Sequence, residues 1–189
     1  MDAIRLRQVQ QREYRDPAAF LKGLRSVELE VLADVADPQV RRLRTNPLRE
    51  GRETRIAALF CHGMGERTGV KVLLSKGEFE DADFVATWTA DNTRHFALVQ
   101  LKEVAPDERG GGVDDVLAPL AKYSGAEDLT VVIHLNREAT FNPTTVIVPP
   151  NLQIAALWFL LCSARDQSEW TIWGNFLESP ERTSFAYPV

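Results

Sequence analysis

The spacing of apolar residues predicts a long helix in the first part of the chain. Between Pro17 and Asp37 they recur every three or four positions, as on one face of an amphipathic helix: Phe20, Leu24, Val27, Val31 and Val35. Pro17 suits the first turn of such a helix. A short basic helix is predicted next, at PQVRRLRT (38–45), before Asn46-Pro47 breaks the chain.

A second helical pattern runs from about Gly51 to Met64 and is predicted to end in the glycine-rich turn GMGERTG. Its apolar positions are Ile56, Leu59, Phe60 and Met64. Glu53 lies three residues before Ile56, so it should share the buried face near the helix start.

Period-two patterns and turn residues then predict an antiparallel meander of three strands, at 70–75, 82–88 and 95–104. A helix is predicted over 113–125, followed by a fully buried strand at 129–136. A strand, a helix and a second strand in that order favour a parallel crossover. The tail can form one helix and a strand or an antiparallel β-hairpin that turns at ARDQ (164–167), and its aromatic content favours the hairpin.

Three polar side chains interrupt the apolar strands of the meander. Gln100 and Lys102 share one face of the third strand, because side chains alternate along a strand. Asp83 opens the preceding strand. If the two strands diverge at this end, an acid, an amide and an amine converge on one point. Such a group can hold Mg²⁺, which takes few protein oxygens together with water and phosphate.

These residues resemble a known signature. Asp83, then sixteen intervening residues, then Gln100-Leu101-Lys102, is similar to the PD-(D/E)XK motif of restriction endonucleases and Holliday-junction resolvases. That superfamily's core is a helix, three strands, a helix and a strand, often with an extra acid from the first helix, where Glu53 stands. The resemblance spans roughly residues 51–136. Two positions depart from the motif, since Ala82 replaces its proline and Gln100 its second acid.

The resemblance implies an α/β protein with a restriction-endonuclease-like core, an N-terminal helical extension and a C-terminal β-hairpin. It implies a metal-dependent nuclease in which Asp83, Gln100 and Glu53 bind Mg²⁺, or alternatively Mn²⁺. Lys102 would assist the attacking water, and these four residues form the expected catalytic set. DNA is favoured over RNA as substrate, and a homodimer or a protein partner is compatible with this function.

Other interpretations stay open. Asp83 and Lys102 can form an ion pair at a sheet edge, with Gln100 exposed and Glu53 simply opening a helix. Glu50 competes with Glu53 for the same role, and the acidic turn around Glu78 can be an auxiliary ligand or a solvated loop. The rival class of function is a non-catalytic interaction protein on a nuclease-like fold, either immunity- or antitoxin-like or a nucleic-acid-binding adaptor.

Charge divides the chain unevenly. Residues 1–55 hold twelve Lys and Arg against nine acids, whereas the whole chain carries a net charge of −5. Residues 1–50 are therefore predicted to be a basic helical arm, and residues 51–189 the nuclease-like core. Arginine suits forked contacts with phosphate, so Arg41, Arg42 and Arg44 are the candidate nucleic-acid contacts.

Apolar runs and cysteines add two expectations. No run approaches the roughly 18 residues of a membrane span, and the N-terminal sequence has no signal-like apolar region, so a cytoplasmic protein without membrane contact is expected. Cys61 and Cys162 both lie in apolar runs, which favours buried free thiols over a disulfide.

Overall fold

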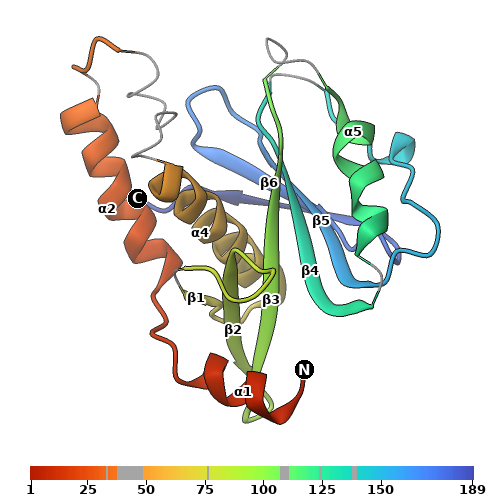
Figure 1. The fold of residues 1–189 in the computed structure, drawn as a ribbon. Coiled ribbons are helices and arrows are strands. Elements are labelled where there is room, and N and C mark those ends of the chain that lie inside the picture. The colour runs from red at the N-terminus through yellow and green to blue at the C-terminus, as the bar shows by residue number, and fades with distance from the viewer. Residues whose placement is uncertain (33, 38–48, 76, 107–110, 124, 138–139) are drawn as a thin grey trace.

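The computed structural model describes residues 1–189 except 33, 38–48, 76, 107–110, 124 and 138–139. Across the described residues, seven strands form one sheet in the order of the sequence (Figure 1). The strands are β1 (Leu73–Ser75), β2 (Phe84–Ala90), β3 (Thr93–Val104), β4 (Ala126–Leu135), β5 (Ile154–Cys162), β6 (Glu169–Gly174) and β7 (Glu181–Ala186). The chain is therefore an α/β protein.

Helices lie on both sides of this sheet. The α-helices are α1 (Ala3–Gln10), α2 (Pro17–Val27), α4 (Arg49–Thr68) and α5 (Val113–Leu117). A π-helical turn, η1 (Glu28–Leu32), continues α2, and two 3₁₀ turns, η4 (Ala118–Lys122) and η5 (Pro143–Thr145), occur later in the chain. Figure 1 shows α2 beside α4 on the left and α5 to the right of the sheet.

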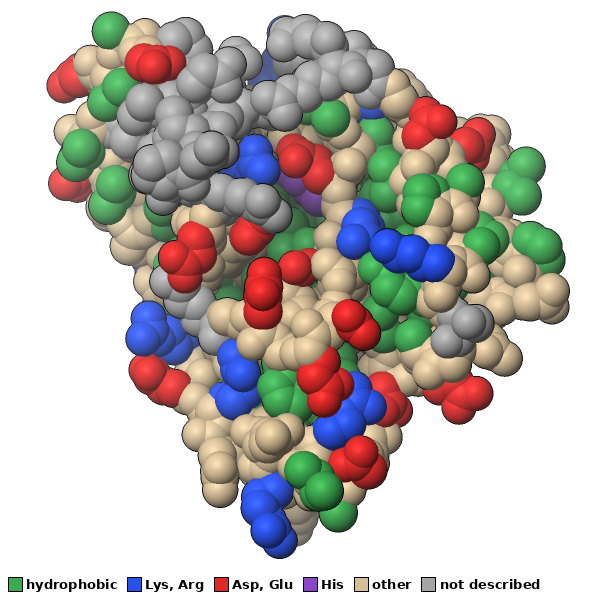
Figure 2. Space-filling model, in the orientation of Figure 1, with side chains coloured by type: hydrophobic (Ala, Val, Ile, Leu, Met, Phe, Trp, Pro, Cys, Tyr) green, Lys and Arg blue, Asp and Glu red, His purple; other side chains and the backbone are tan. Residues whose placement is uncertain are grey.

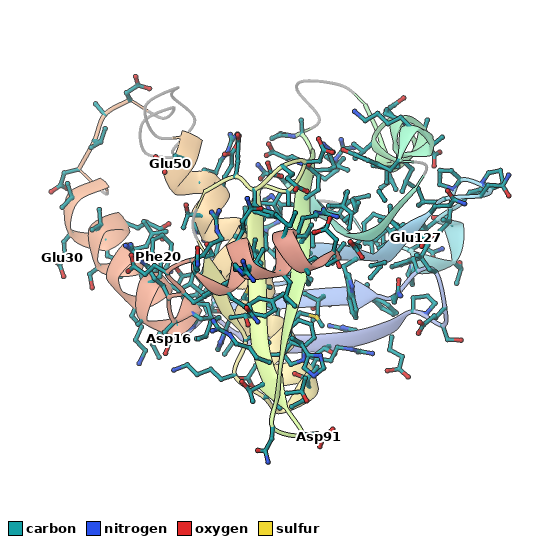
Figure 3. All side chains as sticks on the ribbon, turned by 60° about the horizontal axis from the view of Figure 1, so that its bottom comes forward. Asp16, Phe20, Glu30, Glu50, Asp91 and Glu127 are labelled. Carbon is teal, nitrogen blue, oxygen red and sulfur yellow. The ribbon has the colours of Figure 1, made fainter. Side chains whose placement is uncertain are left out.

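The pairing of the strands confirms the predicted order of elements. β1, β2 and β3 are successively antiparallel, and β4 pairs with β3 in parallel after the crossover through α5. The β2–β3 turn consists of Asp91 and Asn92, both with positive φ, and Figure 3 shows Asp91 at the tip of this hairpin. β4 is buried from Leu129 to Leu135, as its unbroken apolar sequence predicts.

Alternation along β3 separates two hydrophobic clusters. Val99 packs in a cluster with Ala57 and Phe60 of α4, whereas Leu98 packs in a cluster with Leu117 of α5 and Leu120 of η4. We call these sides of the sheet the α4 side and the α5 side. Each neighbouring position on β3 therefore faces a different helix, which decides where its polar residues lie.

The predicted end of the second helix is wrong. α4 continues through GMGERT to Thr68. A Cβ atom at Gly63 would lie 2.5 Å from the ring of Phe185 in β7, so a glycine here permits close packing of a strand that the sequence did not predict. Arg67 also joins this helix to β7, since it donates to Thr183 Oγ1 at 2.9 Å.

The helix predicted over 17–37 is shorter in the structure, where it corresponds to α2. α2 gives way to the π-helical turn at Glu28, and helical structure ends at Leu32 instead of Asp37. Two positions of the predicted apolar face are exposed, Val27 at the end of α2 by 45% and Val31 within the π-helical turn by 58%. Leu21 is the buried residue that joins α2 to the α4-side cluster.

The remaining boundaries differ from prediction by a few residues. The first strand begins at Leu73 rather than at 70, and the basic helix predicted over 38–45 lies outside the described residues. The C-terminal hairpin is confirmed, because β5 and β6 are antiparallel, and β7 extends it by one further antiparallel strand. Over the described part of the chain, no helix combines the length and apolarity needed to cross a membrane.

Candidate functional site

Asp83 lies where β3 extends beyond the start of β2. The last pair in this ladder is Phe84 with Val99, so the next outward-facing N–H of β3, that of Leu101, has no strand partner on this side. The Asp83 side chain supplies one, since its Oδ2 accepts from Leu101 N at 2.6 Å. The same oxygen accepts from Gln100 Nε2, and the Asp83 N–H donates to Val99 O at 2.9 Å. Asp83 is thus fixed to β3 through its backbone and its side chain.

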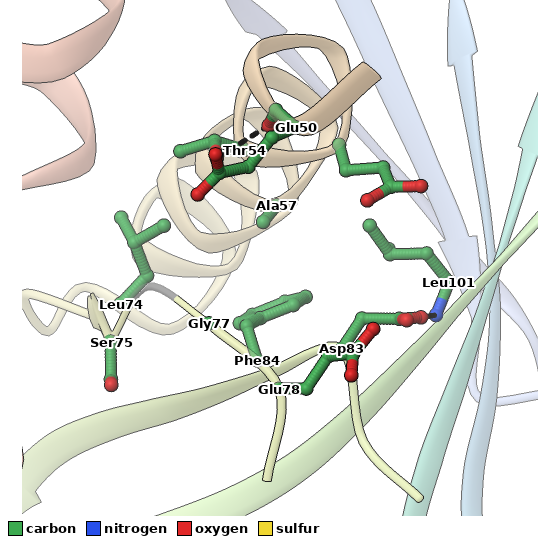
Figure 4. A pocket seen from close by; sticks show the side chains of 11 residues that line it. Glu50, Thr54, Ala57, Leu74, Ser75, Gly77, Glu78, Asp83, Phe84 and Leu101 are labelled. Carbon is green, nitrogen blue, oxygen red and sulfur yellow. Dashed lines mark hydrogen bonds between the residues drawn. The ribbon is translucent and has the colours of Figure 1, made fainter. Parts of the chain in front are cut away.

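A pocket of about 290 Å³ opens beside Asp83 on the α4 side of the sheet. Figure 4 shows α4 along one side of this pocket and the segment from Leu74 to Phe84 along the other. Acids approach from both sides, with Glu50 and Glu53 on α4 and with Glu78 and Asp83 before β2. We call this the acidic pocket.

The surroundings of Asp83 raise the pKa of its carboxyl group. Burial is the largest cause, and the nearby charges of Glu53 and Glu78 raise the pKa further. The hydrogen bond from Leu101 and the charge of Lys102 act in the opposite direction. The charge of Asp83 therefore interacts with Glu53 of α4, with Glu78 of the preceding segment and with the amine of Lys102 on β3.

Gln100 and Lys102 share one face of β3, as the sequence predicts, but that face lies on the α5 side. Lys102 Nζ is 5.9 Å from the centroid of the Tyr123 ring, which follows η4. Lys122 Nζ lies 5.2 Å from the same centroid. Neither Gln100 nor Lys102 is among the residues that line the acidic pocket. Gln100 and Lys102 therefore approach Asp83 from the α5 side of β3, whereas Glu53 of α4 approaches it from the other side.

The edge ion-pair interpretation does not describe this arrangement. β3 is an interior strand, between β2 and β4, and Gln100 is half-buried with its amide bonded to Asp83. Lys102 influences the pKa of Asp83 through its charge, while its ammonium group lies against Tyr123. The amide nitrogen of Gln100 faces Asp83, because an ionised carboxylate only accepts hydrogen bonds.

Asp83, Gln100, Lys102 and Glu53 were predicted as one group, and all four lie near the start of β2. Glu50 and Glu78 line the acidic pocket together with Glu53. The aromatic neighbour Tyr123 was not predicted, because a single tyrosine after a short helix carries no periodic signal. Figure 2 shows acidic side chains gathered in the middle of the face that is drawn, with Lys and Arg around them.

The predicted nucleic-acid contacts Arg41, Arg42 and Arg44 lie outside the described residues. Several other arginines of the first 55 residues are engaged within the protein. Arg55 is buried and pairs with Glu28 at 3.1 Å, and Arg25 donates to Asp166 O at 3.0 Å. Part of the basic excess of this region therefore stabilises the fold.

The donor chemistry of the acidic pocket fits a hard divalent cation. Among the described residues, no three acids, histidines or cysteines are grouped closely enough to hold a metal ion. Mg²⁺ does not need such a cage, since it keeps several waters and uses one or two carboxylates together with substrate phosphate. Asp83 and one of the neighbouring acids would supply the one or two carboxylates that Mg²⁺ uses.

Comparison with known proteins gives no assignment. No family model, curated protein or solved structure matches this chain.

The cysteines offer no competing chemistry. Both Cys61 and Cys162 are free thiols, with Cys61 buried as predicted and Cys162 half-buried. Burial raises the pKa of both thiols, so the reactive thiolate is disfavoured at each position.

Proposed function

We propose that this protein is a metal-dependent nuclease with a restriction-endonuclease-like core. The observation that carries the proposal is the junction at Asp83, which bonds to the QxK segment of β3 and also lines the acidic pocket. The order of helix, antiparallel meander, helix and parallel strand supports the same assignment.

In this proposal Asp83 and Glu53 hold Mg²⁺ or Mn²⁺, with Glu50 and Glu78 available as further acids of the pocket. The bound ion would supply positive charge that stabilises the phosphate and favours ionisation of water. Gln100 orients the Asp83 carboxylate by donating to Oδ2. Because Oδ2 accepts two hydrogen bonds, the other carboxylate oxygen would be the one available to an ion.

Lys102 supplies the positive charge of the protein at this junction. Its ammonium lies close enough to Asp83 to affect the pKa of the carboxyl, and the ring of Tyr123 supports it from the α5 side. A phosphodiester that reaches the junction would meet this amine, which stabilises negative charge as it develops on the phosphate oxygens. Nucleic acid, with DNA favoured over RNA, is the substrate that this chemistry suits.

A second candidate is a nuclease-like protein that only binds a partner, and the exposed acids beside the pocket favour it. The exposed acids Glu78, Glu80 and Asp81 would then form part of a surface for a cationic partner.

The deciding experiment is a cleavage assay on plasmid, linear duplex and single-stranded DNA and on RNA, each in Mg²⁺, Mn²⁺ or EDTA. The nuclease proposal expects cleavage that EDTA abolishes and that Asp83→Asn abolishes. Asp81→Asn is the matched control, because Asp81 is an exposed acid two residues away that does not line the acidic pocket. Absence of cleavage of every substrate by the folded wild-type protein would favour the binding protein.

A further inference from the structure

The connection from β1 to Asp83 carries two acids of the acidic pocket, so its conformation decides where they lie. The described part of this connection includes Ser75, Gly77 and Glu78, all of which line the pocket. Phe79 and Ala82 then pair through two backbone hydrogen bonds, at 2.9 and 3.0 Å, and this pairing delivers the chain to Asp83. We call the described residues of 75–83 the acidic loop.

Arg12, more than sixty residues earlier in the sequence, holds the first half of this loop. Its Nε donates to the buried Ser75 Oγ at 2.6 Å, and its Nη2 donates to Gly77 O at 2.8 Å. Its guanidinium lies 5.7 Å from the centroid of the Phe79 ring. One planar side chain thus fixes a hydroxyl, a carbonyl and an aromatic ring on either side of Glu78.

Two further residues of the N-terminal segment contact the chain beside the positions that Arg12 binds, one just before the acidic loop and one within it. The backbone of Arg15 pairs with Leu74 of β1 through hydrogen bonds of 2.8 and 3.1 Å. Arg5 of α1 pairs with Glu80 at 2.6 Å and with Asp128 of β4 at 3.1 Å. Figure 3 shows α1 lying across the strands of the meander, and its Val9 packs in the same cluster as Val85 and Leu98.

The chemistry of these contacts demands an arginine at position 12. A guanidinium offers several N–H donors in a rigid plane, whereas a lysine offers one ammonium that cannot donate to Ser75 and Gly77 in the same geometry. Gly77 has φ +90°, a conformation that other residues rarely adopt, so the carbonyl that Arg12 binds is itself placed by a glycine. The loop and the arginine are matched to each other.

We propose that Arg12 is a positioning residue for the acidic pocket, an inference that rests on the proposed function. By holding Ser75, Gly77 and Phe79, it fixes Glu78 and the approach to Asp83 opposite Glu53 of α4. The N-terminal segment is then part of the site, although none of its residues lines the pocket. Loss of Arg12 should loosen the loop, move the carboxylates apart and weaken metal binding.

The test compares Arg12→Ala with Arg67→Ala. Arg67 is a matched control because, like Arg12, it contacts a hydroxyl group, a second oxygen acceptor and an aromatic ring, but away from the site; its second acceptor is a carboxylate instead of a backbone carbonyl. It donates to Thr183 Oγ1 at 2.9 Å, pairs with Glu181 at 2.8 Å and lies 5.4 Å from the centroid of the Trp158 ring. Both variants should lose a similar amount of thermal stability, so a general destabilisation is measured in each.

The expected result separates the two variants. Arg12→Ala should raise the Mg²⁺ concentration for half-maximal cleavage, and weaken Mn²⁺ binding in titrations of the metal alone, by about 10- to 100-fold. Arg67→Ala should change neither. Arg12→Lys keeps the charge and one donor and should restore part of the metal affinity.

Amide hydrogen exchange gives a readout that needs neither metal nor substrate. The N–H of Leu101 is bonded to Asp83, and the N–H of Asp83 is bonded to Val99. In Arg12→Ala these two amides should exchange about 10-fold faster while those of β6 and β7 are unchanged, and Arg67→Ala should give the reverse pattern.

Unchanged exchange at Asp83 and Leu101 in Arg12→Ala would overturn the positioning role. So would equal effects of Arg12→Ala and Arg67→Ala on cleavage with an unaltered Mg²⁺ requirement. If the wild-type protein cleaves nothing, the proposed function fails by itself, and the exchange pattern still decides whether Arg12 positions the loop.

Discussion

On the α4 side of β3, Glu50, Glu53, Glu78 and Asp83 line one pocket, whereas on the α5 side the same strand places Lys102 against the ring of Tyr123. The two sides are separated by the thickness of one strand. Acids and amine are thereby kept from neutralising each other in a direct ion pair, and both remain close enough to act on Asp83. The difference indicates a site assembled at a strand end, where side chains from both faces of a sheet can reach the same point.

The largest expected effect comes from the residue that joins the two sides. Asp83→Asn should lower cleavage by about 10³-fold or more, because it removes the charge to which the ion binds while the amide oxygen can still accept from Leu101. The measurement is the rate of plasmid cleavage, with circular dichroism to show that the variant folds. Near-normal cleavage by Asp83→Asn would separate catalysis from this junction.

The α5 side should contribute next in size. Lys102→Ala should lower cleavage by about 10²-fold or more, because it removes the positive charge at the junction. Lys122→Ala is the matched control, since Lys122 contacts the same ring but is exposed. Comparable losses in the two variants would mean that the α5 side acts through Tyr123 and not through a charge at the junction.

The α4 side can be resolved further by comparing its two helical acids. Glu53→Gln should reduce cleavage by roughly 10-fold, and Glu50→Gln by less. Of these two acids, only Glu53 is among the charges that raise the pKa of Asp83. Rates measured over a range of Mg²⁺ concentrations test this order. A larger loss in Glu50→Gln would transfer the ligand role to Glu50.

Substitutions of Gln100 test whether a residue on the α5 side affects metal binding and cleavage at Asp83. Gln100→Leu keeps the bulk of the side chain but removes the donor to Asp83, and should depress cleavage without unfolding the protein. Gln100→Glu adds a negative charge and should tighten Mg²⁺ binding, which calorimetric titration measures. Normal cleavage by Gln100→Leu and unchanged Mg²⁺ affinity in Gln100→Glu would show that Gln100 neither orients Asp83 for cleavage nor lies close enough to affect the ion.

The smallest effect concerns stability in the absence of metal. The folded-state pKa of Asp83 is raised above 3.8, mainly by burial. A raised pKa means that the stabilising contribution is fully present below the unfolded pKa and is lost as pH rises through the folded pKa. Asp83→Asn should therefore melt above the wild type at neutral pH, and this advantage should shrink towards pH 3. An advantage that persists in acid would have another origin.

Local patterns predicted the part of the fold that depends on neighbouring strands. The meander, the crossover to β4 and the β5–β6 hairpin follow from alternation, turn residues and chain order. The position of Gln100 and Lys102 on the same face of β3 followed from the same alternation. What alternation could not reveal is which helix would cover that face.

The missed features depend on contacts between distant segments. The glycines of GMGERTG indicate a helix end, but Gly63 is needed because Phe185 packs against it. The apolar positions after Leu24 indicate a continuous α-helix, yet α2 ends at Val27 and a π-helical turn follows it. Arg12 lies in the predicted basic helical arm, and its structural role could not be predicted because its partners Ser75 and Gly77 lie far along the chain.

The most direct test of the account is Mn²⁺ binding followed by electron paramagnetic resonance, with and without a non-hydrolysable DNA oligonucleotide. A site built from Asp83 and few other oxygens should bind the ion weakly alone and more tightly when phosphate completes its coordination. Asp83→Asn should abolish that gain, and Asp81→Asn should preserve it. If the oligonucleotide leaves the Mn²⁺ affinity of the wild type unchanged, or if Asp83→Asn shows the same gain, Asp83 is not the centre of a phosphodiesterase site.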